Sequence, residues 1–194
     1  MQMGIPRYTV LANNKARKRM TTLRRRTLFL GLSDGARVDY IRHQNVGLIT
    51  NEQVVGSTQL DRAKWKDLLD ELRKDVKDLN STFRAVYLID DFAATGTSFF
   101  RIDSEKAKGK LCKFATSVRE AQKELEGQIF EADYQVFIHH YVGTAKARME
   151  LADRLTDGRK VLAEAGLPPN ISTTYGLCLP DALPLDVANP ADRG

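Results

Sequence analysis

A short apolar run followed at once by two acidic residues constrains the fold of this chain most. Residues 85–91 read Ala-Val-Tyr-Leu-Ile-Asp-Asp, and a continuous apolar run is typical of a strand buried on both faces of a parallel sheet. A nearly continuous apolar run at residues 27–32 ends at a turn-forming Ser-Asp-Gly, and a third strand is predicted at residues 134–141, stopping before Gly143. All three strands are predicted to end at one edge of one sheet, where such sheets bind ligands.

Helical patterns lie between these runs. Apolar residues recur at three- and four-residue steps between residues 65 and 79 and predict a helix with one apolar face: Trp65, Leu68, Leu69, Leu72, Val76 and Leu79. Further helices are predicted at residues 36–44, from Ser98, across residues 111–125, and from Ala145 to a stop at residues 166–169. Weaker strands are expected at residues 48–55 and 171–175. Alternating strands and helices predict an α/β fold with a central, mainly parallel sheet flanked by helices, a Rossmann-like three-layer architecture.

Length and composition fit one globular domain. The chain has 194 residues, of which 42% are hydrophobic and 28% charged. No apolar run approaches the roughly 20 residues that span a bilayer, so no membrane association is expected. Cys112 and Cys178 match no metal spacing, which indicates a reduced, cytoplasmic setting. The expected organisation is a basic helical extension (residues 1–26), an α/β domain (27–176) and a proline-containing tail (177–194).

The basic extension suggests two alternatives. The net charge is +5, and much of the excess lies in Lys15, Arg17, Lys18, Arg19, Arg24, Arg25 and Arg26. Such a cluster can neutralise nucleic-acid phosphates. It is also typical of the solvated face of a helix, and this second interpretation is favoured because no interleaved aromatic residues or recognisable reading helix accompany the cluster.

The segment after residue 89 is the best candidate for a binding site. Two carboxylates at the end of a buried strand are costly unless something uses them, and the vicinal hydroxyls of a ribose can donate to them. Small and hydroxyl-bearing residues follow, namely Ala94, Thr95, Gly96, Thr97 and Ser98. With the N–H groups of the next helix they can hold a phosphate. The alternative is an acidic turn with a Ser/Thr helix cap. A P-loop is excluded because no Gly-Lys-Ser/Thr occurs.

This segment resembles the phosphoribosyl-pyrophosphate (PRPP) loop of type I phosphoribosyltransferases, in which apolar residues precede an acidic pair and a small-residue turn containing Thr-Gly. The resemblance implies that Asp90 and Asp91 are catalytic and contact the ribose hydroxyls. It implies that Ala94, Thr95, Gly96, Thr97 and Ser98 hold the 5′-phosphate. Phe92, Ala93 and Thr97 depart from the usual pattern without removing a required contact.

By position, the loop after the first strand corresponds to the family's pyrophosphate loop, which implies pyrophosphate binding by Ser33, Asp34, Gly35, Ala36 and Arg37. An ordinary tight turn with a solvated arginine is an equal alternative. The arrangement over residues 27–175 resembles the phosphoribosyltransferase-like domains of prokaryotic conflict and anti-phage systems, in which Ser-Asp-Gly-Ala-Arg and Asp-Asp-Phe recur. That likeness implies a protein partner in a defence system.

Three functions are therefore carried forward. The resemblance implies transfer of a phosphoribosyl group from PRPP with release of pyrophosphate, with Mg²⁺ arriving on PRPP and no direct protein ligands to the metal. The first alternative is a non-catalytic module that senses PRPP or a nucleotide-like small molecule. It stays open because residues 45–60, where the family's mobile loop is expected, contain no lysine or arginine. The second is a nucleic-acid-binding adaptor that acts through the basic N-terminus.

Overall fold

The computed structural model of the chain describes residues 12–94, 97–103 and 106–180. The order of elements is α1 (Asn14–Arg25), β1 (Thr27–Gly31), the 3₁₀ helix η2 (Asp34–Ala36), α2 (Val38–Gln44), the 3₁₀ helix η3 (Asn51–Gln53), β2 (Val54–Val55), α3 (Arg62–Val76), β3 (Phe83–Ala93), β4 (Arg101–Asp103), β5 (Lys106–Lys108), α4 (Lys110–Glu124), β6 (Phe130–Thr144), α5 (Ala145–Asp157), α6 (Arg159–Glu164) and β7 (Ile171–Leu179).

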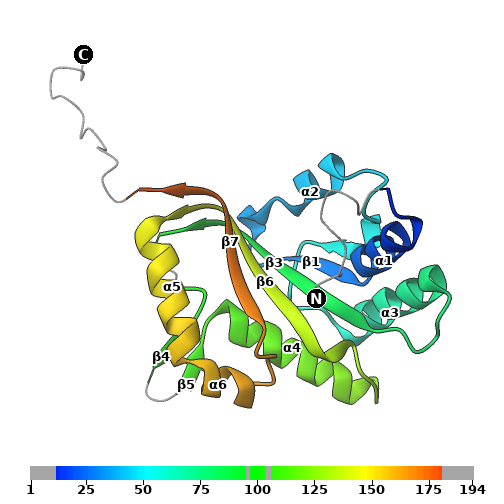
Figure 1. Cartoon of the computed structure of the whole chain (residues 1–194). Coiled ribbons are helices and arrows are strands. Elements are labelled where there is room, and N and C mark those ends of the chain that lie inside the picture. Colours follow the sequence, from blue (N-terminus) through cyan, green and yellow to red (C-terminus); the bar gives the residue numbers. More distant parts are fainter. Residues whose placement is uncertain (1–11, 95–96, 104–105, 181–194) are drawn as a thin grey trace, which may run out of the picture.

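A five-stranded, all-parallel sheet with the order β2-β1-β3-β6-β7 forms the centre of the fold (Figure 1). The three apolar runs of the sequence are its three middle strands. Thr27 aligns with Ala85, and Val86 aligns with Val136. The predicted α/β fold is confirmed. The weak strand expected at residues 48–55 is reduced to the two residues of β2, and β7 continues to Leu179, past the predicted start of the tail.

The strand order places the topological switch point of the sheet between β1 and β3. The chain leaves β1 for β2 on one side, then returns to place β3 on the other side of β1. The connections after β1 and β3 therefore diverge, and open α/β sheets bind ligands at such a switch point, beyond the carboxyl ends of the strands. The loops after β1 and β3 are the two that the sequence singles out.

Most of the core lies on one face of the sheet. Leu28, Leu88 and Val136 pack there against buried side chains of α3, α4, α5 and α6, and Figure 1 shows these helices on one side of the sheet with α2 on the other. Trp65, Leu68, Leu69 and Leu72 of α3 are buried as predicted. Leu79 is 82% exposed instead, because α3 ends at Val76 and Lys77 takes a left-handed conformation (φ 58°).

The other face carries a smaller cluster of residues from α2, η2, β2 and β3, including Val38, Val54 and Ile89. Beside it, Phe29 and Phe137 stack on either side of Tyr87, with ring centroids 5.3 and 4.6 Å away, respectively. These three rings are half-buried. The sheet is thus flanked by helices on both faces, but unequally.

The basic residues of α1 divide into two groups. Arg25 pairs with Asp75 of α3 at 2.5 Å, and Arg26 pairs with Glu131 at 2.7 Å, with side chains only 11% and 19% exposed. These two arginines tie α1 to the fold, which corrects the expectation that they only face solvent. Lys15, Arg17, Lys18 and Arg19 are exposed. Within the described part of the chain, no helix is long and apolar enough to cross a membrane.

Candidate functional site

The acidic pair lies within a strand rather than in the turn after it. β3 continues to Ala93, whereas β1 stops at Gly31, which aligns with Ile89. Beyond that point β3 pairs only with β6, for example Asp90 with His140. The side of β3 left open is taken by the loop after β1, whose Leu32 N–H donates to the Ile89 carbonyl at 2.8 Å. The two predicted loops therefore share one rim, at the switch point.

The two carboxylates point to opposite faces of the sheet, because successive residues of a strand alternate. Asp90 lies on the face of Leu88 and α4, and Asp91 lies on the face of Ile89 and η2. They do not stand side by side, as an acidic pair in a turn could. The two carboxylates therefore contact different residues and are described separately below.

Asp90 is buried, with 3% of its surface exposed, and both of its oxygens have donors. The Ser33 hydroxyl donates to Oδ1 and the Lys110 ammonium donates to Oδ2, each at 2.5 Å. Asp90 thus fixes the first turn of α4 and the loop after β1 relative to β3. A ligand contact to Asp90 requires one of these donors to give way.

His140 completes the buried surroundings of Asp90. It is 1% exposed, stacks on Tyr175 with centroids 5.5 Å apart, and meets the edge of Phe99. Burial lowers the pKa of its imidazole, and this outweighs the opposite effect of Asp90. The buried surroundings therefore favour the neutral imidazole. Among the described residues its Nδ1 has no hydrogen-bond partner.

Asp91 is exposed and faces Gly35. Its Oδ1 accepts from the Phe92 N–H at 2.8 Å. A Cβ on Gly35 would lie 2.3 Å from Oδ2 of Asp91 and 2.9 Å from its Cγ. A glycine at position 35 is therefore what allows the carboxylate to lie against the loop after β1. Of the two acidic residues, Asp91 is the one whose oxygens a ligand reaches without breaking an ion pair.

The loop after β1 is short and turned back on itself. Ala36 N–H donates to the Ser33 carbonyl at 3.0 Å, and Arg37 takes a left-handed conformation with φ 41°. Asp34 and Arg37 are exposed, so a carboxylate and a guanidinium flank the rim. The Tyr141 hydroxyl donates to the Arg37 carbonyl at 3.4 Å and ties the loop to β6.

The loop after β3 differs from its prediction. Thr95 and Gly96 lie outside the described residues. The Thr144 hydroxyl donates to the Ala94 carbonyl at 2.9 Å, and residues 97–99 form a turn. The helix predicted from Ser98 is absent from this described stretch, because the β4–β5 hairpin precedes α4.

Gly109 explains where α4 begins. Its φ is 121°, and a Cβ there would lie 2.3 Å from the Phe99 carbonyl oxygen. Only glycine takes this conformation at so close an approach. The Lys110 N–H then donates to the Ser98 carbonyl at 3.3 Å, so the start of α4 lies beside Ser98. α4 matches the helix predicted across residues 111–125.

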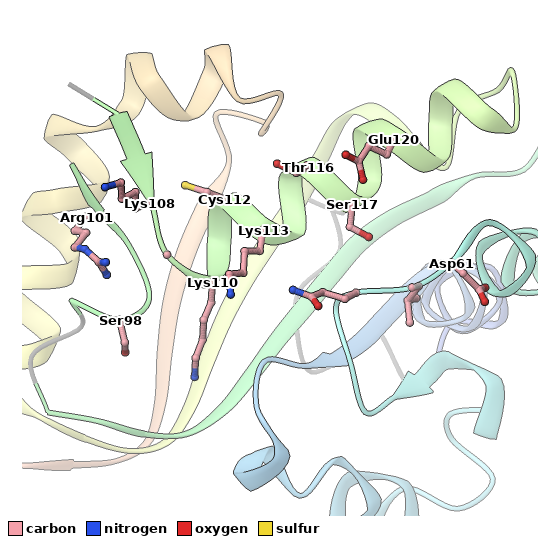
Figure 2. Close-up of a pocket in the computed structure, with 13 residues that line it drawn as sticks. Asp61, Ser98, Arg101, Lys108, Lys110, Cys112, Lys113, Thr116, Ser117 and Glu120 are labelled. Carbon is pink, nitrogen blue, oxygen red and sulfur yellow. The ribbon is translucent and has the colours of Figure 1, made fainter. Parts of the chain in front are cut away.

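Basic residues that the sequence did not single out line this rim. Two pockets share Gln59, Lys110 and Lys113. One, of about 280 Å³, reaches Ser33 and Asp34. The other, of about 1000 Å³, reaches Ser98, Arg101 and Lys108 (Figure 2). The signal for these residues is the run of lysines and arginine between positions 101 and 113, directly after the candidate phosphate loop.

Comparisons with protein-family models, with curated proteins and with solved structures find no match to this chain. Within the described residues, no group of three or more His, Cys, Asp or Glu side chains is arranged to hold a metal ion. The functional argument therefore depends on the fold, on the geometry of the rim and on the charges around it.

Proposed function

We propose that the chain binds PRPP or a closely related phosphorylated ribose at the rim between β1 and β3, and transfers its phosphoribosyl group with release of pyrophosphate. The observation that carries the proposal is the meeting of the two loops at the switch point. The exposed carboxylate of Asp91 lies against Gly35 of the loop after β1. On the opposite face of β3, Asp90 binds the Ser33 hydroxyl and the Lys110 ammonium and so holds the loop after β1 and the start of α4 at the same rim.

Each part of the rim has a task in this proposal. Asp91 accepts hydrogen bonds from the ribose hydroxyls, and Asp90 acts through Ser33 and Lys110, which it positions. Ser98 and the residues before it hold the 5′-phosphate, and Thr95 and Gly96 stay predictions from the sequence. The loop from Ser33 to Arg37 faces the pyrophosphate, where the Arg37 guanidinium can pair with phosphate oxygens.

The resemblance implies no direct protein ligand to Mg²⁺, but this rim offers oxygen donors that would fit the ion. The exposed carboxylates of Asp91 and Asp34 are the hard ligands that Mg²⁺ prefers, and it commonly binds through one or two carboxylates together with substrate phosphates. When bound with pyrophosphate, the ion neutralises charge on the leaving group. Asp90 is a poorer candidate because both of its oxygens already accept from Ser33 and Lys110.

The proposed reaction requires mainly that the protein position the two substrates and neutralise the negative charge of the leaving pyrophosphate. The bond between the anomeric carbon and the pyrophosphate oxygen breaks, with its electron pair leaving on the pyrophosphate. A ring nitrogen of the acceptor base then forms a new bond to that carbon with its electron pair and releases its proton to solvent. Residues 45–60 contain no lysine or arginine. Lys110 and Lys113 can supply positive charge in their place, because both line the same pocket as residues 56–59. This favours the transferase over the sensor, which remains the second candidate because residues 45–60 themselves carry no cation.

A pyrophosphate-release assay separates these two candidates. The chain is incubated with PRPP, Mg²⁺ and each of the common nucleobases in turn, and released pyrophosphate is measured. We expect release that depends on both PRPP and one base. Binding of PRPP without release over the whole panel would favour the sensor. Absence of PRPP binding would overturn both.

A further inference from the structure

A groove beside helix α1 carries apolar side chains that the proposed function does not use. Met20 and Leu23 line this groove, which has a volume of about 580 Å³, and each of them is 42% exposed. Arg84, near the start of β3, also lines it, so the groove lies at the amino end of the strand whose carboxyl end carries Asp91. Large apolar side chains gathered in an exposed hollow are typical of an interaction site.

Basic side chains surround this apolar lining. Lys15, Lys18 and Arg19 belong to the same groove. All three are exposed, and among the described residues none of them pairs with a carboxylate. Lys15, Arg19 and Leu23 follow one another at four-residue steps, so they lie in one row along the helix. These cations therefore remain available to a negatively charged partner.

Two arginines on the wall of the groove add to this positive charge. Arg26 and Arg84 both pair with Glu131, at 2.7 and 3.1 Å, respectively, so two guanidinium groups share one carboxylate. Arg26 also donates to the Thr82 carbonyl at 2.8 Å, which fixes its side chain against the fold. The groove thus combines an apolar lining with an excess of positive charge.

An acidic protein segment fits both features of the groove better than a nucleic acid or a membrane does. A nucleic-acid backbone would use the cations and leave Met20 and Leu23 exposed. A bilayer takes up apolar side chains that project from the face of a helix, whereas these two line a hollow. An acidic amphipathic helix can place apolar side chains in a groove and carboxylates against its basic edges.

We infer that this groove docks a protein partner through an acidic amphipathic helix, whose apolar side chains pack on Met20 and Leu23 and whose carboxylates pair with the basic side chains around them. The inference does not rest on the proposed function, because the groove and the rim lie at opposite ends of β3. It assigns α1 a second task besides its ion pairs to the rest of the fold, that of a docking helix.

Fluorescence anisotropy with a labelled acidic peptide tests the inference. The peptide is a helix of about four turns with leucines on one face and glutamates elsewhere, and a second peptide has serine in place of each leucine. We expect the wild type to bind the leucine peptide roughly tenfold more tightly than the serine peptide. Met20→Ser/Leu23→Ser should remove this preference. Lys18→Gln/Arg19→Gln should weaken binding of the leucine peptide about three- to tenfold.

Leu79→Ser/Met149→Ser is the matched control, because it removes apolar side chains that are 82% and 54% exposed elsewhere on the surface, and it should keep the preference. Thermal unfolding checks that each variant is folded. If the wild type binds neither peptide, or if the preference survives in Met20→Ser/Leu23→Ser, the inference is wrong, whatever the result with PRPP. Tighter binding of a labelled single-stranded DNA, or of anionic lipid vesicles, than of the leucine peptide would overturn it as well.

Discussion

Replacing Lys110 with methionine should lower the free energy of unfolding by about 3 kcal/mol, the lower end of the cost of breaking a buried ion pair. The carboxylate of Asp90 is 4% exposed and the Lys110 side chain is 29% exposed. Without the ammonium, the buried negative charge keeps only the Ser33 hydroxyl as a side-chain donor. The lower end applies because Lys110 is partly exposed. Urea unfolding followed by circular dichroism measures the change.

Two further variants show whether the unpaired charge is the cause. Asp90→Asn/Lys110→Met removes both charges and keeps the shape of residue 90, so most of the lost stability should return. Lys113→Met removes a lysine one turn further along α4, where no described carboxylate pairs with it, and should change the unfolding free energy by less than about 0.5 kcal/mol. Equal effects of Lys110→Met and Lys113→Met would contradict this account of Asp90.

Gly35→Ala should weaken PRPP binding about a hundredfold while leaving the fold intact. The new methyl carbon would lie 2.3 Å from Oδ2 of Asp91, so the carboxylate must move away from the loop after β1. The backbone of Gly35 is outside the left-handed region, so alanine adds no conformational strain there. Calorimetry with PRPP and Mg²⁺ measures the affinity, and thermal unfolding checks the fold.

Gly127→Ala is the matched control. Its added Cβ would meet only the Leu125 carbonyl oxygen, at 3.6 Å, and residue 127 follows α4, away from the rim. PRPP affinity should be unchanged. Because Gly35→Ala acts by moving Asp91, adding Asp91→Asn to it should cost little more. Fully additive losses would show that the two residues act on the ligand independently.

The sequence predicts the fold well because its signals are continuous. The runs that become β1 and β3 are nearly continuous in apolar residues, and β6 is largely apolar between Tyr134 and Tyr141, since both faces of a middle strand are covered. The turn residues after β1 and the acidic residues of β3 come directly after these runs. Because parallel strands end at the same edge of a sheet, the sequence already predicts that both groups of residues lie at one edge. Leu79 is the exception, because apolar periodicity continues past the residue at which α3 ends.

The details of the site depend on contacts between residues far apart in the sequence, which a local sequence pattern does not predict. The alternation of Asp90 and Asp91 follows from β3 continuing to Ala93, and this depends on its pairing with β6. The start of α4 depends on Gly109 lying against Phe99. Lys110 reaches Asp90 across twenty positions of chain, so only the folded hairpin brings the two charges together.

Calorimetry of wild type and Asp91→Asn with PRPP and Mg²⁺ tests the central claim most directly, with an analogue of PRPP that lacks the 2′ and 3′ hydroxyls as the second ligand. We expect Asp91→Asn to bind PRPP roughly ten- to hundredfold more weakly, the cost of one charge-assisted hydrogen bond. The analogue should bind the wild type weakly and Asp91→Asn no worse. If PRPP binds both proteins equally well, or binds neither, the phosphorylated-ribose site at Asp91 is contradicted.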